Sequence, residues 1–176
     1  MKALCVFDLD GTLIPGDSFA QIVKSRILRT PTLYLTVILR VLNLISGEKF
    51  AQHAHRALLA SLDPDNNPAL IDSIVSSVLV ERAAMVLDWK EKGAHVVLLS
   101  ASPQDYVGRV GSILGFDESF GSTWKDGRYL HLHGARKRDF IETRFPKERW
   151  RRSFAIADSQ SDMALLSLFE ESILIK

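Results

Sequence analysis

Four short apolar runs constrain the fold of this chain more than any other feature of its sequence. They cover residues 3–8, 94–100, 153–158 and 172–175, and the first three end at a polar side chain. Continuous apolar runs of this length are typical of parallel strands that are buried on both faces. Helical patterns separate the runs, so we expect an α/β fold with a doubly wound, Rossmann-like and mainly parallel sheet. The polar strand ends of such a sheet meet in one crevice.

The helical patterns between these runs have recognisable boundaries. Ser102 and Pro103 are typical of an N-cap and first-turn pair, and Gly115 stands where the helix that follows them should stop. Gly93 in the same way ends one long helical pattern over residues 68–92. An Asp-Gly turn within residues 124–129 predicts a small hairpin.

Residues 16–62 carry helical pattern and no strand, and they are too many for one crossover between the first two strands. They predict a small helical cap that is inserted into the sheet domain. We therefore expect a core of residues 1–15 and 88–176, and a cap with its return helix over residues 16–87. A chain of 176 residues can support such a core, because chains of this size bury roughly two thirds of their unfolded surface.

Residues 33–45 form the most hydrophobic part of the chain, and their polar members Thr36, Arg40 and Asn43 fall on one helical face. The stretch is shorter than the ~20 residues that cross a bilayer, so we expect no spanning helix. We interpret it as a cap helix that packs against its neighbour and the sheet. The alternative is a helix that lies in a membrane surface. Basic residues just upstream would favour that alternative: Lys24, Arg26 and Arg29.

The charge balance and the cysteine count exclude some classes of protein. With 22 basic against 21 acidic residues, the formal charge of +1 predicts no general attraction to nucleic acid. The single cysteine, Cys5, cannot form an internal disulfide, and the sequence does not open with a secretory signal pattern. We therefore expect a cytoplasmic protein in which Cys5 is a small buried hydrophobic residue.

Two carboxylates, Asp8 and Asp10, follow the first apolar run. Residues two apart on an extended chain point to the same side, so both can enter one small volume. There they repel unless a cation or a shared proton relieves them. Gly11 lets the chain turn and exposes backbone N–H groups that, with the Thr12 hydroxyl, could line an anion pocket. A divalent ion reconciles the carboxylates with a bound anion, and Mg²⁺ prefers such oxygen ligands.

Polar residues at the other predicted strand ends extend this constellation. Ser100 ends the second run, and Asp158, followed by Asp162, ends the third. An N-cap role explains only one of those two carboxylates. A metal that faces Asp8 and Asp10 would use Asp158 directly.

A basic segment follows the predicted hairpin. Lys137 opens a helix there and is the candidate cation for a bound phosphate group, although Arg136 and Arg138 on either side leave the choice open. We interpret the wider basic run over residues 136–152 as a solvated helix face that also biases the crevice towards anions.

In these residues the sequence resembles the haloacid dehalogenase-like (HAD) hydrolase superfamily, specifically its phosphoserine-phosphatase-like branch, subfamily IB, with a helical C1-type cap. The resemblance extends over essentially the whole chain. Residues 8–13 match the first family motif, 98–103 the second, Lys137 the third and 157–162 the fourth. One residue departs from the pattern, because Ala157 stands where the family usually has glycine.

The resemblance implies a Mg²⁺-dependent phosphatase that hydrolyses a small-molecule phosphate monoester. Asp8 would be the nucleophile that forms an aspartyl-phosphate, and Asp10 would be the general acid and then the general base. Magnesium would lie among Asp8, the backbone carbonyl of Asp10, and Asp158, with Asp162 in support. The residues implied to bind the phosphate group are Gly11, Thr12, Ser100, Ala101 and Lys137.

Other functions are open at this stage. A lipid-phosphate phosphatase at a membrane surface would use residues 33–45 and the basic residues before them. A non-hydrolytic phosphoacceptor signalling domain also gathers carboxylates, a serine and a lysine at strand ends, but the cap and Asp10 favour turnover. An inactive binding module and dehalogenation rank lower, because the set of carboxylates with Lys137 is complete. We expect cap residues such as Asp17 and Phe19 to set the substrate specificity.

We assign no metal to the histidines. His53 and His55 point about 200° apart on a helical pattern, which prevents joint chelation, and we interpret both as lying on a solvated face. His131 and His133 alternate with leucines and can share a face, but no third ligand stands at a suitable spacing.

Overall fold

The computed structural model describes residues 1–175, which include a six-stranded sheet. Its strands are β1 (Lys2–Phe7), β2 (His95–Pro103), β3 (Glu118–Lys125), β4 (Arg128–Leu130), β5 (Trp150–Ala157) and β6 (Glu171–Leu174). The spatial order is β4-β3-β2-β1-β5-β6, and neighbouring strands are parallel except for β3 and β4. The predicted α/β fold with a mainly parallel sheet is confirmed.

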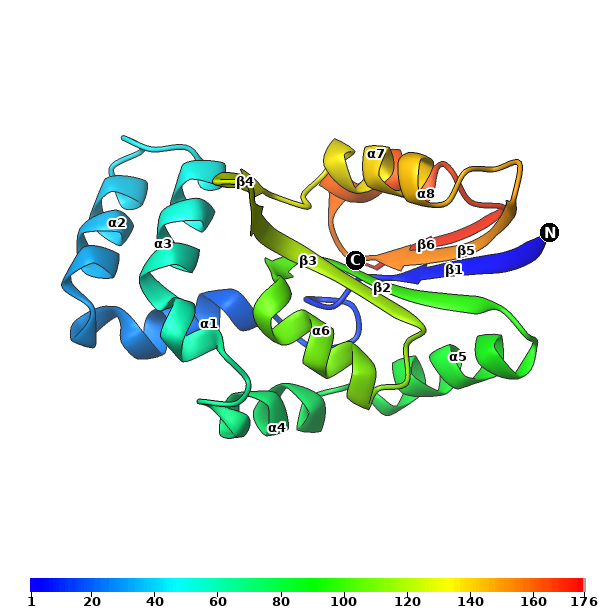
Figure 1. Ribbon diagram of the computed structural model, residues 1–176, viewed down its shortest axis with the longest axis horizontal. Helices are drawn as coiled ribbons and strands as arrows, with labels where there is room; N and C mark the ends of the chain where they lie inside the picture. Colours follow the sequence, from blue (N-terminus) through cyan, green and yellow to red (C-terminus); the bar gives the residue numbers. More distant parts are fainter. Residues whose placement is uncertain (176) are drawn as a thin grey trace.

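Helices cover both faces and one end of this sheet, as Figure 1 shows. In chain order they are α1 (Ser18–Arg26), α2 (Pro31–Val41), α3 (Gly47–Leu62), α4 (Pro68–Ser76), α5 (Val80–Glu91), α6 (Gln104–Ile113), α7 (Ala135–Arg144) and α8 (Met163–Leu166), with 3₁₀ turns at Ile27–Arg29 and Gln160–Asp162. One face of the sheet carries α4, α5 and α6, and the other carries α7 and α8 (Figure 1). Helices α1 to α3 stand beyond the end of the sheet.

The central strand β1 has a hydrophobic core on each side, because successive residues of a strand point to opposite faces. Cys5 and Phe7 belong to the cluster that includes side chains of α5 and α6. Leu4 and Val6 belong to the cluster that includes side chains of α7 and α8. All four are almost fully buried, which explains why the run is continuously apolar and confirms the buried position of Cys5.

The prediction of one long helix over residues 68–92 is wrong. The structure has two helices there, α4 and α5, with a break at residues 77–79. The backbone N–H of Leu79 donates a hydrogen bond to the carbonyl of Leu13, at 2.9 Å. This contact ties the break to the loop that follows β1. Gly93 ends α5 as expected, with φ +77°.

The start of α6 also differs from the prediction. Ser102 lies within β2 and does not cap the helix, and α6 begins after Pro103 without a side-chain cap. The Ser102 hydroxyl instead donates a hydrogen bond to Asp10 of the first motif, so it does not cap the helix. Gly115 follows the end of α6 as predicted, with φ +78°.

The predicted hairpin is present, and its first strand, β3, also belongs to the main sheet. Asp126 and Gly127 form the turn with φ of 49° and 74°, which suits a two-residue hairpin loop. Before the turn, β3 also pairs with β2 as a parallel strand of the main sheet. We did not expect this strand, because residues 118–125 mix polar and apolar side chains and form no apolar run.

The three polar residues of the helix within residues 33–45 differ in burial, and Arg40 and Asn43 are exposed. Thr36 from its polar side is buried and donates its hydroxyl to the carbonyl of Thr32, at 2.8 Å. Leu33 is buried as well, whereas Leu35 and Val41 are exposed. Helix α2 packs against α3, as expected. Within residues 1–175, the helices all lack the length and apolar content that crossing a membrane requires.

Candidate active site

The carboxyl ends of β1, β2 and β5 open into a pocket of about 550 Å³ that α1, α3 and α7 also line. Most residues predicted for the site line this pocket: Asp8, Asp10, Gly11, Ser100, Ala101, Lys137, Asp158 and Asp162. Asp17 and Phe19, the residues expected to set specificity, line it too. Thr12 does not. Its side chain is fully buried, and its Oγ1 has no hydrogen-bond partner within the described part of the chain.

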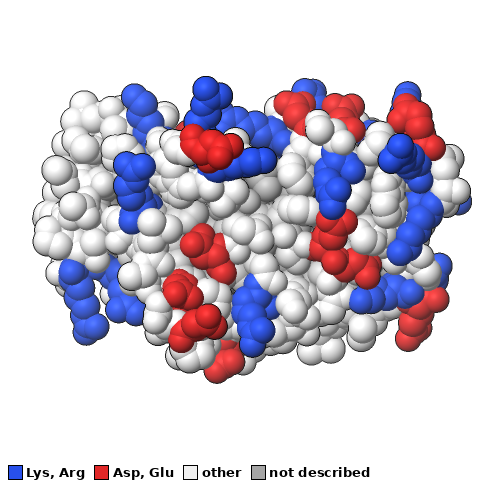
Figure 2. Space-filling view, viewed as in Figure 1, with Lys and Arg blue, Asp and Glu red and all other residues white. Residues whose placement is uncertain are grey.

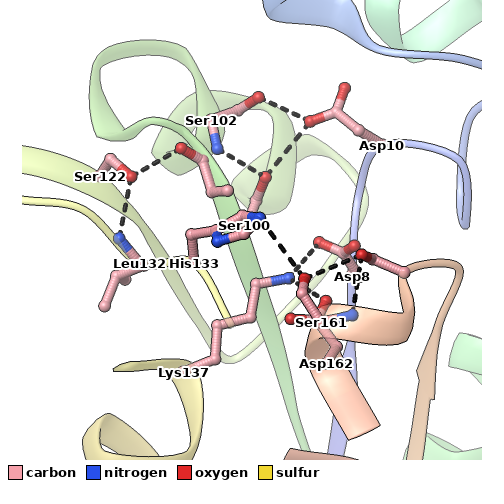
Figure 3. Close-up of polar contacts among 12 residues, drawn as sticks. Asp8, Asp10, Ser100, Ser102, Ser122, Leu132, His133, Lys137, Ser161 and Asp162 are labelled. Carbon is pink, nitrogen blue, oxygen red and sulfur yellow. Dashed lines mark hydrogen bonds and ion pairs between the residues drawn. The ribbon is translucent and has the colours of Figure 1, made fainter. Parts of the chain in front are cut away.

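Lys137, in the first turn of α7, is held between two buried carboxylates (Figure 3). Its Nζ lies 3.0 Å from Asp8 Oδ1 and 2.8 Å from Asp162 Oδ2. Burial acts to lower the pKa of Lys137, but the charges of Asp8 and Asp162 outweigh it and raise that pKa. Burial also raises the pKa of Asp8 to about 7, although Lys137 opposes this effect. Asp8 is thus a desolvated carboxylate whose ionised form depends on a nearby cation.

The two arginines beside Lys137 pair with other carboxylates. The Arg136 guanidinium makes two hydrogen bonds to Glu48 of α3, at 2.7 and 3.1 Å. Arg138 pairs with Asp139 on its own helix, at 2.6 Å. Of these three basic residues it is Lys137 that reaches the pocket, while Arg136 links the core to α3.

Asp10 has different partners from Asp8, although the two are only two residues apart. The Ser102 hydroxyl donates to Asp10 Oδ2 at 2.6 Å, and the Ser100 hydroxyl donates to the same oxygen at 3.4 Å (Figure 3). The backbone N–H of Ser18, at the start of α1, donates to Asp10 Oδ1 at 2.6 Å. Hydroxyl and amide donors therefore fix Asp10, whereas an ammonium group pairs with Asp8.

We did not predict from the sequence the role of two serines that make hydrogen bonds at the pocket. Ser102 binds Asp10, and its position two residues after Ser100 on one strand is the signal that could have revealed it. Ser122 of β3 donates its hydroxyl to the carbonyl of Ala101, at 2.6 Å, and accepts the backbone N–H of Leu132, at 3.0 Å. One buried hydroxyl thus joins the end of β2 to the segment that leads into α7.

Gly11 brings the Asp158 carboxylate against the backbone that follows Asp10. Gly11 has φ +67°, and a Cβ at this position would overlap the Asp158 carboxylate. A side chain at residue 11 is therefore excluded both by backbone conformation and by space. Burial raises the pKa of Asp158, so this carboxylate too is poorly neutralised by the protein alone.

The donor set suits a divalent cation. Four carboxylates line the same pocket as the Lys137 ammonium: Asp8, Asp10, Asp158 and Asp162. In addition, the buried Oδ1 of Asp162 lacks a hydrogen-bond partner among the described residues. Residues 1–175 contain no cluster of three His, Cys, Asp or Glu side chains placed to hold a metal. The expected Mg²⁺ set needs only two carboxylates and a backbone carbonyl, completed by phosphate and water.

His55 is not on a solvated face, contrary to the prediction, whereas His53 is exposed. The His55 ring is almost fully buried, with Nε2 2.8 Å from Asp105 Oδ2 and Nδ1 3.4 Å from the Tyr129 hydroxyl. This contact connects α3 to α6 and to β4. The sequence pattern could not show it, because Asp105 lies 50 residues away.

His131 and His133 line the pocket and stack on each other, with ring centroids 5.4 Å apart. Burial, together with the charge of His133, lowers the pKa of His131 to about 4. His131 is therefore a neutral side chain at ordinary pH. His133 lies 3.4 Å from the hydroxyl of Ser161, on the loop that follows β5.

The sheet and the pocket together define a doubly wound α/β protein with an acidic site at its strand ends. The model of one family, described as haloacid dehalogenase-like hydrolase, matches residues 5–167. The chain therefore belongs to the haloacid dehalogenase-like hydrolase family.

Relatives and solved structures support this membership. Protein CicA of Caulobacter vibrioides is 32% identical over 140 residues, which cover 72% of this chain and 63% of CicA. A Bordetella pertussis protein of unknown function has a TM-score of 0.77 at 18% identity, covering 99% of this chain and 90% of its own. A phosphoserine phosphatase, solved as a phospho-aspartyl intermediate analogue, has a TM-score of 0.64 at 17% identity, covering 98% and 86%. At these identities the solved structures show a shared fold.

Proposed function

We propose that the chain is a magnesium-dependent phosphatase that hydrolyses a phosphate monoester through an aspartyl-phosphate on Asp8. The observation that carries this proposal is the placement of Asp8 and Asp10 in one pocket with different partners. Asp8 lies beside the Lys137 ammonium, whereas hydroxyl and amide donors hold Asp10. Phosphoryl transfer needs such a division, with a nucleophile beside a positive charge and a separate acid.

The reaction would proceed in two displacements at phosphorus. First, an Asp8 carboxylate oxygen attacks phosphorus and the bond to the ester oxygen breaks, while protonated Asp10 gives its proton to that oxygen. An alcohol leaves. A water molecule then attacks the aspartyl-phosphate and passes a proton to Asp10, and the bond between phosphorus and Asp8 breaks. The products are inorganic phosphate and the regenerated Asp8 carboxylate.

The proposed phosphate-binding groups surround Asp8. Lys137 and the Ser100 hydroxyl would contact the oxygens of the transferred group, together with backbone N–H groups of Gly11 and Ala101. The Thr12 hydroxyl has no role in this proposal, because Thr12 lies outside the pocket lining.

The proposed metal ligands are Asp8, Asp158 and the backbone carbonyl of Asp10. A bound Mg²⁺ would supply charge neutralisation on the phosphate group. Asp162 has a positioning role, because its carboxylate holds the Lys137 ammonium at 2.8 Å. The unpartnered Asp162 oxygen leaves room for a further contact, such as a metal-bound water.

The descriptions of solved structures that share this fold support the reaction class. Two solved phosphoserine phosphatases that share this fold are described as a phospho-aspartyl intermediate analogue and as a substrate-bound complex. We accordingly place the chain in the phosphoserine-phosphatase-like branch. We propose a core of residues 1–15 and 88–176, and a cap of residues 16–87 that closes over the substrate. The cytoplasmic location of the chain stays a prediction. The chain spans about 63% of the length of its CicA relatives.

The proposal is tested by Asp8→Asn in an assay with a generic aryl phosphate and Mg²⁺. We expect turnover to vanish, and we expect chelation of Mg²⁺ to abolish turnover of the unmodified chain. Asp139→Asn is the matched control, because this carboxylate lies exposed on α7 and outside the pocket. Full activity of Asp8→Asn would show that the mechanism is wrong. A stable stoichiometric phosphoprotein that releases no phosphate would indicate a phosphoacceptor domain instead.

A screen of phosphorylated metabolites and lipid phosphates would then identify the substrate class. The pocket wall contributed by α1 and α3 includes Asp17, Phe19 and Phe50, which we propose as specificity residues. Substitution of these side chains should change the preference among substrates more than the rate with a small aryl phosphate.

A further inference from the structure

Helix α2 turns an apolar strip towards the outside of the molecule. We call this surface the α2 strip, and its residues are Tyr34, Leu35, Ile38, Val41 and Leu42. A helix advances by about 100° per residue, so these five side chains fall within a sector of about 120°. They are all exposed, and Val41 reaches 73%. Burial of Leu33 and Thr36 on the other side shows that α2 already has its packing partner and that the strip faces solvent.

A groove beside the α2 strip continues the apolar surface. It lies between α1 and α2 and has a volume of about 290 Å³. Ile27, Val37 and Phe50 line it, and Lys24 and Arg40 line it as well. Basic side chains with long aliphatic stems are thus part of the same surface as the apolar strip.

The charged residues of α1, of the 3₁₀ turn that follows it and of α2 are all basic. They are Lys24 and Arg26 of α1, Arg29 of the turn and Arg40 of α2, and Lys24 and Arg40 line the groove beside the strip. Within residues 1–175 none of the four pairs with a carboxylate, and Arg40 bonds the amide of Asn43 instead, at 3.1 Å. Figure 2 shows the consequence, since the end of the molecule that carries α2 is white and blue, and red atoms begin nearer the middle.

We propose that the α2 strip docks on an anionic lipid surface. An amphipathic helix with an apolar face and basic flanks lies in the plane of a membrane interface, where apolar side chains enter the headgroup region. Lys24 and Arg40, which line the groove beside the strip, would contact lipid phosphates, which give the surface its negative potential. A second copy of this chain is a poorer occupant, because a two-fold contact through the same patch would bring these positive charges of both copies together.

The test is flotation of the purified chain with vesicles at low salt. Vesicles that contain phosphatidylglycerol should carry the chain upwards, and vesicles of phosphatidylcholine alone should carry at least tenfold less. The Leu35→Ser/Leu42→Ser pair should weaken binding to the anionic vesicles at least tenfold. The matched control is Leu87→Ser/Ile113→Ser, on core helices, because Leu87 is 57% exposed against 58% for Leu35. This control should bind as the unmodified chain does.

A second variant tests the electrostatic half of the proposal without touching an apolar side chain. Lys24→Glu/Arg40→Glu should lower binding to anionic vesicles at least tenfold, and added salt should weaken binding of the unmodified chain. Asp8→Asn should float normally, which keeps this result separate from the proposed phosphatase activity. No flotation at low salt, or equal losses in the α2 pair and its control, would overturn the proposal. Self-association that Leu35→Ser/Leu42→Ser abolishes, without vesicle binding, would assign the strip to a second copy.

Discussion

Lys137→Met is the substitution whose effect follows most directly from the structure. The Lys137 side chain is 2% exposed, and its Nζ lies 3.0 Å from Asp8 and 2.8 Å from Asp162. Methionine keeps much of the volume but leaves both buried carboxylates without their cation. Breaking a buried ion pair in this way costs about 3–5 kcal/mol. Since a chain of roughly 150–250 residues loses about 2–4 °C of Tm per kcal/mol, we expect Tm to fall by about 6–20 °C.

Arg136→Met is the control, because Arg136 stands next to Lys137 and also forms an ion pair. Its pair with Glu48 is at the surface, with the two side chains 51% and 46% exposed, and such pairs contribute about 0–1 kcal/mol. Thermal unfolding of the variants is followed by circular dichroism in EDTA. The chelator removes divalent ions, which could otherwise replace the lost charge of Lys137. Lys137→Met/Asp162→Asn should have a higher Tm than Lys137→Met, because the double variant no longer buries the unpaired Asp162 carboxylate. Similar shifts for Lys137→Met and Arg136→Met would refute the reasoning.

Three further predictions concern other parts of the molecule. Burial raises the pKa of Cys5 from 9.0 to about 12, so iodoacetamide should label the native thiol on the order of a thousandfold more slowly than the urea-unfolded one. Gly121→Ala should cost about 1–3 kcal/mol in urea melts, because its Cβ would lie 2.6 Å from the Ser102 carbonyl; Gly47→Ala, with open space, should be near neutral. The His55 hydrogen bond lowers the pKa of Asp105 below 3.8, so its stabilisation is present above that value and is lost as the pH falls through the lower pKa of the folded state. The stability difference between the unmodified chain and Asp105→Asn should therefore shrink in acid, and a constant difference would contradict this.

The central sheet and most of the pocket could be predicted because they depend on local patterns. A strand buried on both faces must be apolar at every position, as Leu4 to Phe7 are, and this leaves a continuous run in the sequence. The polar residue that ends such a run lies at the sheet edge. Asp8, Ser100 and Asp158 were therefore accessible from the sequence, and the structure brings them to one pocket.

The features that could not be predicted depend on hydrogen bonds of single polar side chains, two of which reach distant parts of the chain. β3 contains no apolar run, because polar residues interrupt it. One of them, Ser122, donates a hydrogen bond to the Ala101 carbonyl of the neighbouring strand. His55 has its partner on α6, so its burial leaves no mark in its own helical pattern. Thr36 is buried because its hydroxyl bonds the carbonyl one turn before it, which removes the need for water. In each case a polar residue is satisfied by hydrogen bonds that the apolar periodicity does not show.

The central position of β1 has a consequence for how the chain acquires its pocket during synthesis. β1 is made before β2 and β5, but Cys5 pairs with Val96 of β2 and with Phe154 of β5, about 90 and about 150 residues later. Contacts of such sequence separation form slowly and late. Asp8 therefore meets Lys137 and Asp158 only after the residues up to 158 have been made. The residues of α1 to α3 are all made before those of β2 and β5, whose ends they meet at the pocket.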